Sequence, residues 1–197
     1  MTDYTLAYTP FAARTKLQRN TSDTPDPNLH EKYQQIVGSL MYAMLGSHPN
    51  ICFTVNQLTQ YRTNPTQTHM NTASHVLQYL KGTHHYQLSY GQNDCAELIA
   101  YSDSDWAADM DDRRSTTRYC YTLTGACIAW QTRKQHTVAL SLTEAEYMAL
   151  TKTAKHSQWA IQLLQQLDFE VDTIKLYSNS LGARAIAEIS VHSHQTY

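Results

Sequence analysis

The stretch 101-YSDSDWAADMDD-112 holds five aspartates in twelve residues and directly follows the apolar run 98-LIAY-101. An apolar run of this kind is typical of a buried strand, and open α/β sheets bind ligands where such strands end. Two explanations of the acids are open. The aspartates form a solvated loop, or some of them hold a divalent metal ion, which prefers hard oxygen ligands.

The pattern of apolar residues changes after Gly82. Three segments before it repeat apolar residues at the spacing of a helix, namely 31–45, 50–63 and 67–81. The segments after it are predicted as strands at 86–90, 97–101, 117–123, 126–132 and 173–178, and as helices at 143–167 and 181–189. Strands followed by an alternation of helix and strand predict an α/β fold, in which a mixed sheet with flanking helices is preceded by a small helical segment.

The same change predicts the domain organisation. Residues 1–30 are polar and rich in turn-forming residues, so we expect an irregular N-terminal segment there. Residues 31–85 are expected to form a helical region, and residues 96–197 an α/β domain. The boundary is expected near residues 83–96.

The composition, 42% hydrophobic and 16% charged, is that of an ordinary globular protein. The net charge of −2 means that any contact with nucleic acid has to come from a local basic patch. The four cysteines contain no CxxC pair, which favours reduced thiols and an intracellular location. No apolar run approaches the roughly 20 residues that cross a bilayer, so no membrane partner is expected. Nothing in the sequence predicts a small-molecule cofactor.

The long predicted helix carries an acid on its apolar face. At about 100° per residue, Glu146 lies on the face that should pack against the sheet, whereas Glu144 lies roughly opposite. Glu144 follows Ser141 at the spacing of a capping box. The apolar face is made of Leu142, Ala149, Thr153, Ala160, Leu164 and Leu167. A carboxylate on that face requires a partner, a proton or a metal ion. Asp103 and Glu146 could therefore begin a divalent-metal site; the alternative is an acidic turn and a Glu146–arginine pair.

Three stretches carry a resemblance to a known family. They are YSDSDWAADMDDRRST from residue 101, KQHTVALSLTEAEYMAL from residue 134, and 176-LYSNSLGA-183. They resemble the ribonuclease H domain of Ty1/copia-type retrotransposon Pol polyproteins. Upstream, 33-YQQIVGSLMYA-43 and 75-HVLQYLKGTHHYQLSY-90 resemble the segment that joins the reverse transcriptase to that domain. The resemblance runs from about residue 9 to the end.

The resemblance implies a ribonuclease H fold with a mixed five-stranded sheet. It also implies a Mg²⁺- or Mn²⁺-dependent hydrolysis of the RNA strand in an RNA–DNA hybrid, with the hybrid as partner. By motif, Asp103 matches the first catalytic carboxylate and metal ligand, and Glu146 the second. Asn179 stands where the family has the third, an aspartate, and only its neutral carbonyl oxygen can bind a cation. The fourth acid would follow the segment 191-VHSHQTY-197, so the domain is expected to be truncated at its C-terminus.

Further departures from the family pattern lie at positions where the family has small, uncharged residues. Arg118 and Leu142 replace small residues, and Ala108 replaces a glycine. With two of four carboxylates missing, we expect an impaired or inactive nuclease. The alternatives are a non-catalytic protein that binds nucleic acid, or a retroelement relic without a selected function.

Basic residues flank the hairpin predicted for residues 117–132. They could contact a phosphate backbone. The alternative is a solvated hairpin in which Arg113 and Arg114 pair with the adjacent aspartates. The candidates are Arg113, Arg114, Arg118, Arg133 and Lys134.

Overall fold

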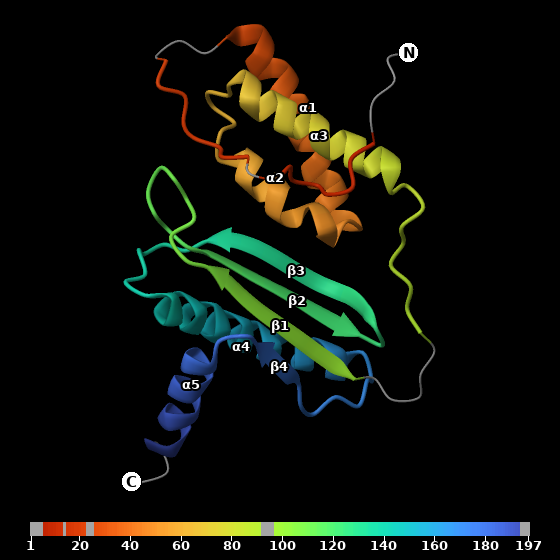
Figure 1. The fold of residues 1–197 in the computed structure, drawn as a ribbon. Coiled ribbons are helices and arrows are strands. Elements are labelled where there is room, and N and C mark those ends of the chain that lie inside the picture. The colour runs from red at the N-terminus through yellow and green to blue at the C-terminus, as the bar shows by residue number, and fades with distance from the viewer. Residues whose placement is uncertain (1–5, 14, 23–25, 92–96, 194–197) are drawn as a thin grey trace. The chain divides into compact units, whose positions relative to one another are not determined.

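The computed structural model describes residues 6–13, 15–22, 26–91 and 97–193, with side chains described as far as residue 188 (Figure 1). The chain forms two compact units, residues 1–87 and residues 88–197. Within the described residues, no helix has the length and apolar character that crossing a membrane requires.

The first unit is helical. It contains α1 (Pro27–Gly46), a short 3₁₀ turn (Pro49–Ile51), α2 (Cys52–Thr59) and α3 (Gln67–Gly82). Asp26 begins α1, because its side chain accepts hydrogen bonds from the N–H groups of Asn28 and Leu29. The core is apolar and includes Tyr33, Val37, Leu40, Ile51, Val55, Leu58, Ala73 and Val76. The three predicted helices are confirmed, although the second ends at Thr59 and not at residue 63.

The second unit is built on a four-stranded sheet. Its strands are β1 (Leu98–Asp105), β2 (Thr116–Leu123), β3 (Ala126–Lys134) and β4 (Lys175–Ser178), in the order β3-β2-β1-β4. Strand β2 runs antiparallel to both β1 and β3, and β4 runs parallel to β1. Helices α4 (Leu142–Gln166) and α5 (Leu181–Ser193) complete the unit. The predicted mixed sheet with flanking helices is confirmed, with four strands among the described residues where the resemblance implies five.

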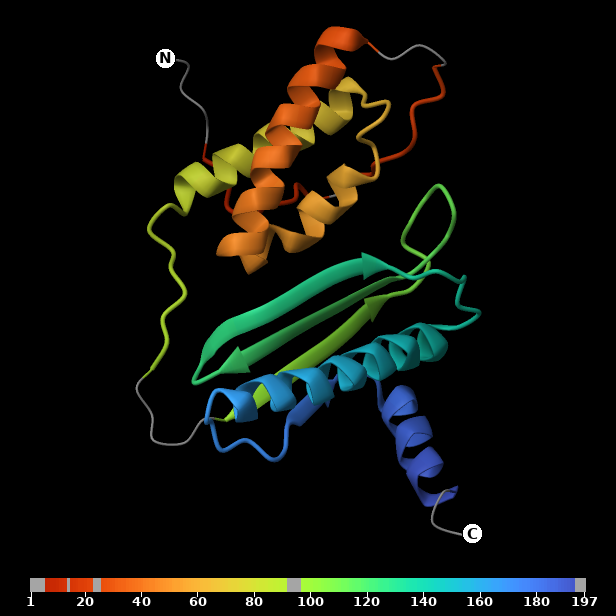
Figure 2. The same cartoon turned by 180° about the vertical axis from the view of Figure 1, so that it is seen from behind.

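Helix α4 covers one face of the sheet (Figure 2). The Tyr121 hydroxyl donates a hydrogen bond to the Thr153 carbonyl at 2.6 Å, and the Thr153 hydroxyl donates to Ser102 at 3.1 Å. Because side chains alternate along a strand, Asp103 points to the opposite face from Ser102. Leu142 and Leu167, which were expected on the packed face of α4, are exposed, since they lie at the two ends of the helix.

The segment 86–90 was predicted as a strand, and this prediction is wrong. The N–H of Tyr86 donates to the carbonyl of Thr83 and closes a turn. The hydroxyl of Tyr90 donates to the carbonyl of Cys127, so this tyrosine contacts the β2–β3 hairpin through its side chain. The residues have the composition of a strand, but their backbone pairs with no other strand in the described part of the chain.

Candidate metal and nucleic-acid site

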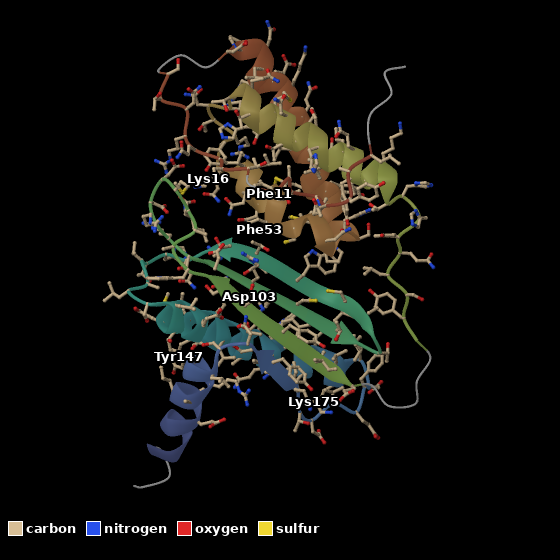
Figure 3. All side chains as sticks on the ribbon, viewed as in Figure 1. Phe11, Lys16, Phe53, Asp103, Tyr147 and Lys175 are labelled. Atoms are coloured by element: carbon tan, nitrogen blue, oxygen red, sulfur yellow. The ribbon has the colours of Figure 1, made fainter. Side chains whose placement is uncertain are left out.

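Asp103 lies on the central part of the sheet, on β1 (Figure 3). Strand β1 continues to Asp105, so Asp103 is inside the strand and not beyond it as its predicted end at residue 101 implied. Asp103 pairs with Arg118 of β2 across the antiparallel ladder. On the other side, Ser102 pairs with Ser178, the last residue of β4.

Glu146 approaches β1 from α4. Its side chain is buried, with only 4% of the residue exposed, so the prediction that it faces the sheet is confirmed. Its carboxylate accepts a hydrogen bond from the backbone N–H of Ser104. Backbone N–H groups lie in the plane of the sheet, and β4 ends opposite Ser102. The Glu146 carboxylate therefore lies at the edge of β1, in line with the end of β4.

The surroundings of Glu146 favour its protonated form. Burial raises the pKa of Glu146, and the negative charge of Asp103 raises it further, although the Ser104 N–H and Arg118 oppose these effects. One carboxylate oxygen, Oε2, is buried and accepts no hydrogen bond from the described residues. A buried carboxylate with an unpartnered oxygen and a second acid nearby is a place where a cation would be stabilised.

A cationic side chain already lies beside these acids. The Arg118 guanidinium is 3.5 Å from Asp103 Oδ2 and 3.1 Å from Asp105 Oδ2. Asp105 also accepts a hydrogen bond from the Thr116 N–H at 2.5 Å. Burial nevertheless raises the pKa of Asp105, even though the Thr116 N–H and Arg118 oppose it.

Asp105 is one of the five aspartates for which a solvated loop was one of the two explanations, and the structure places it in a strand instead. It is the last residue of β1, and 15% of its side chain is exposed. The sequence held a signal for it, since Asp103 and Asp105 are two residues apart and side chains two apart on a strand share a face. The strand was predicted to end at residue 101, so Asp103 and Asp105 were not recognised as two residues of the same strand.

Asn179 immediately follows β4 and is exposed. Since Ser102 pairs with Ser178, continuing the parallel register places Asn179 next to Asp103. Among the described residues, no group of three or more histidine, cysteine, aspartate and glutamate side chains is arranged to hold a metal ion. Asp103 and Glu146 thus fit part of a site for one divalent cation, and the set of carboxylates that a pair of ions needs is absent from the described residues.

Three of the five candidate phosphate-binding residues contact carboxylates instead. The Lys134 ammonium is 2.6 Å from Asp109 and 2.9 Å from Asp112, and the Arg114 guanidinium is 3.8 Å from Asp112. Arg118 is held by two aspartates, as described above. The expectation that Arg113 and Arg114 pair with the adjacent aspartates is thus confirmed for Arg114, with Lys134 as an additional cation, but no such pair is found for Arg113 among the described residues.

The remaining two candidates for phosphate binding, Arg113 and Arg133, differ from these three in their surroundings. Arg113 and Arg133 are exposed and form no ion pair within the part of the chain that the structure describes. Arg113 has a positive φ of 59°, in the turn that leads into β2.

The mixed sheet with its flanking helices is the α/β fold that the sequence predicts, with Asp103 on β1 and Glu146 on α4. No protein-family model matches the chain. The chain is 36% identical over 195 residues to a retrovirus-related Pol polyprotein from transposon TNT 1-94 of Nicotiana tabacum, covering 95% of this chain and 14% of that one. It is 37% identical over 177 residues to the corresponding polyprotein from transposon RE2 of Arabidopsis thaliana, covering 89% and 12%. The chain belongs to the family of copia-type retrotransposon Pol polyproteins.

Two other similarities were found. Secreted RxLR effector protein 161 of Plasmopara viticola is 42% identical over 127 residues, which cover 64% of this chain and 89% of that protein. A solved structure of the foamy viral protease-reverse transcriptase in complex with dsDNA has 14% identity and a TM-score of 0.40, covering 83% of this chain and 35% of that one. The chain spans only about one seventh or less of the two transposon polyproteins.

Proposed function

We propose that residues 96–197 are a ribonuclease H-like domain whose inherited activity, hydrolysis of the RNA strand of an RNA–DNA hybrid, is impaired. One observation carries this proposal. Asp103 and Glu146 come together at the end of β4, but the next place beside Asp103 is held by neutral Asn179, and Arg118 lies against the Asp103 carboxylate.

The residues that would hold a divalent cation are Asp103 and Glu146. When bound there, such an ion would supply activation of the attacking water and stabilisation of the leaving oxygen. Asn179 contributes a carbonyl oxygen without charge, so one negative charge is lost from the site. Arg118 adds a fixed positive charge, because its guanidinium stays protonated in proteins. Both differences disfavour a second cation and weaken the attraction for the first.

The test is cleavage of a labelled RNA–DNA hybrid in Mg²⁺ and in Mn²⁺. It compares the parent chain, Asn179→Asp, and Asp103→Asn as the control. We expect the parent to be silent or very weak, and Asn179→Asp to gain activity that Asp103→Asn abolishes when the two are combined. Cleavage by the parent that Asp103→Asn removes would show a working nuclease and would overturn the proposal of impairment.

A second function is binding of nucleic acid without cleavage. Exposed Arg113 and Arg133 favour it, since neither is paired with a carboxylate among the described residues. Titration with a labelled hybrid should then give an affinity that falls with salt and is weakened by Arg133→Ala. Lys134→Ala should weaken binding less, because the charge of Lys134 is already balanced by Asp109 and Asp112. No affinity at low salt would exclude this function and leave the relic as the remaining alternative.

A further inference from the structure

Two cysteines lie side by side on the β2–β3 hairpin. The Sγ atoms of Cys120 on β2 and Cys127 on β3 are 2.9 Å apart, and neither cysteine is in a disulfide. A disulfide bond is about 2.05 Å long, so the two sulfurs need to approach by only about 1 Å to form one.

A β-bulge brings the two thiols to the same face of the sheet. Tyr121 pairs with Ala129, but Thr122 pairs with Cys127, so Ile128 is an extra residue in β3. In a regular ladder Cys127 would pair with Leu123, whose side chain points to the other face from Cys120. The bulge moves Cys127 opposite Thr122, and residues 120 and 122 share a face because they are two apart.

The environment of the pair distinguishes its two members. Cys120 is partly exposed, whereas Cys127 is buried, with 8% of the residue accessible. The hydrogen bond with Cys127 lowers the pKa of Cys120, although burial opposes it. The thiolate is the nucleophilic form of cysteine. Cys120 is therefore the thiol that reacts first, and Cys127 is placed to react second.

We propose that Cys120 and Cys127 are a redox-modification site, which closes to an intramolecular disulfide when the chain meets a peroxide. The Cys120 thiolate attacks a peroxide oxygen, the O–O bond breaks, and Cys120 becomes a sulfenic acid as hydroxide leaves and is protonated to water. The Cys127 sulfur then attacks the Cys120 sulfur, an S–S bond forms, the S–O bond breaks, and a second water leaves. Hydrogen peroxide takes up the two electrons that the thiols lose, and a thiol reductant reverses the reaction.

The disulfide would join the edge strand β3 to β2 next to the candidate metal site. Cys120 follows Arg118 by two residues on β2, so both side chains lie on the same face, the one that carries Asp103. The inference does not depend on nuclease activity, since it rests on the geometry of the two thiols alone.

Both cysteines fall in one tryptic peptide, Tyr119–Arg133, which makes the test direct. The full chain is treated with hydrogen peroxide, alkylated, digested and analysed by mass spectrometry. We expect this peptide to lose two hydrogens, to escape alkylation, and to recover both alkylation sites after reduction. The Cys52→Ser/Cys95→Ser variant should give the same result, because neither residue takes part.

Two kinds of variant test the pairing itself. Cys127→Ser should stop the reaction at the Cys120 sulfenic acid, which dimedone traps. Cys120→Ser should leave Cys127 with its alkyl group and without a dimedone adduct after the same treatment, because the thiol that reacts first is absent. The proposal is overturned if the parent peptide carries two alkyl groups after peroxide, or if Cys120 pairs with Cys52 or Cys95 instead. It is overturned equally if both thiols oxidise to sulfinic acids without a disulfide.

Discussion

The guanidinium of Arg118 lies 3.5 Å from the carboxylate of Asp103, and the two residues face each other across β1 and β2. Arg118 also reaches Asp105 and influences Glu146, so one fixed positive charge is shared by three acids. A positive charge among carboxylates has the same sign as a metal ion and competes with it for the same oxygens. We therefore expect Arg118 to act as an internal counter-ion that reduces the affinity of this site for divalent cations.

The first prediction is that Arg118→Ser tightens the binding of Mn²⁺. Removal of the guanidinium leaves Asp103 and Glu146 without their cationic neighbour, so we expect roughly tenfold higher affinity, equivalent to about 1.4 kcal/mol. Electron paramagnetic resonance of free Mn²⁺ measures the affinity without any need for nuclease activity. Arg133→Ser is the matched control, because Arg133 is exposed on β3 and pairs with no carboxylate among the described residues.

An equal affinity in the parent and in Arg118→Ser would contradict this role of Arg118. The Arg118→Ser/Asn179→Asp double variant extends the test to cleavage of a hybrid. It should exceed Asn179→Asp alone, because it both restores the third carboxylate and removes the competing charge.

The second prediction concerns the buried acid on α4. Because burial and Asp103 raise the pKa of Glu146, the folded state holds this proton to a higher pH than the unfolded state does. The free energy of unfolding of the parent should fall as the pH rises from the ordinary pKa of a glutamate through the raised pKa of Glu146. Glu146→Gln should remove that loss and stabilise the second unit by about 1 kcal/mol above this range.

Urea unfolding at pH 5 and pH 8 measures this effect. All three tryptophans, Trp106, Trp130 and Trp159, lie in the unit 88–197, so tryptophan fluorescence follows that unit. Glu144→Gln is the control. Glu144 is exposed at the start of α4 and accepts a hydrogen bond from the Leu140 N–H, so its loss should not stabilise the protein. A Glu146→Gln variant that is less stable than the parent at pH 8 would contradict the assignment.

The third prediction is that Lys134→Met destabilises the second unit by about 2 kcal/mol, because it removes the cation that lies nearest to two carboxylates, those of Asp109 and Asp112. Asp109 is the more buried of the two, with 3% of its side chain exposed. Although burial opposes it, the bond with Lys134 lowers the pKa of Asp112. The difference in the free energy of unfolding between parent and variant should therefore be largest at pH values above the ordinary pKa of an aspartate. It should shrink as the pH falls through the lowered pKa of Asp112.

Arg114→Met is the control for this series. Its contact with Asp112 is long, at 3.8 Å, and partly exposed, so we expect a change below about 0.5 kcal/mol. Equal losses for Lys134→Met and Arg114→Met in tryptophan-monitored urea unfolding would show that Lys134 has no special role in holding the loop.

Patterns that depend on local spacing predicted a large part of this fold. The 3.6-residue period placed Glu146 on the buried face of α4, and the alternation in residues 117–132 predicted the β2–β3 hairpin. Both are confirmed. Each depends only on residues close in sequence, so no knowledge of distant partners was needed.

Features that depend on how strands pair were not predicted. The end of β1 at Asp105 depends on Thr116 of β2, whose N–H binds the Asp105 carboxylate. The contact between Cys120 and Cys127 depends on one bulged residue, which changes the face of every side chain beyond it. The segment 86–90 has strand-like residues but lacks a strand partner in the described part of the chain. Local composition carries no information about such partners.

The last prediction concerns the helical unit, where buried His69, the third residue of α3, caps the start of that helix. The N–H of Thr66 donates a hydrogen bond to His69 Nδ1 at 2.8 Å, which is the role that a glutamate or glutamine plays in a capping box. The His69 ring also stacks on Tyr61, with the ring centroids 4.1 Å apart. Because Nδ1 accepts this bond, it carries no proton, and His69 is fixed in one tautomer.

His69→Leu introduces an apolar side chain of similar size and leaves the Thr66 N–H without this acceptor. We expect α3 to be destabilised by about 1 kcal/mol, so that the Thr66 amide exchanges with solvent about fivefold faster. Amide hydrogen exchange followed by nuclear magnetic resonance reads this residue directly. His69→Gln is the matched variant, because its side-chain carbonyl can accept the same hydrogen bond and should keep more of the protection. If His69→Gln and His69→Leu lose protection at Thr66 equally, then the stacking of His69 on Tyr61 stabilises the start of α3, and the cap does not.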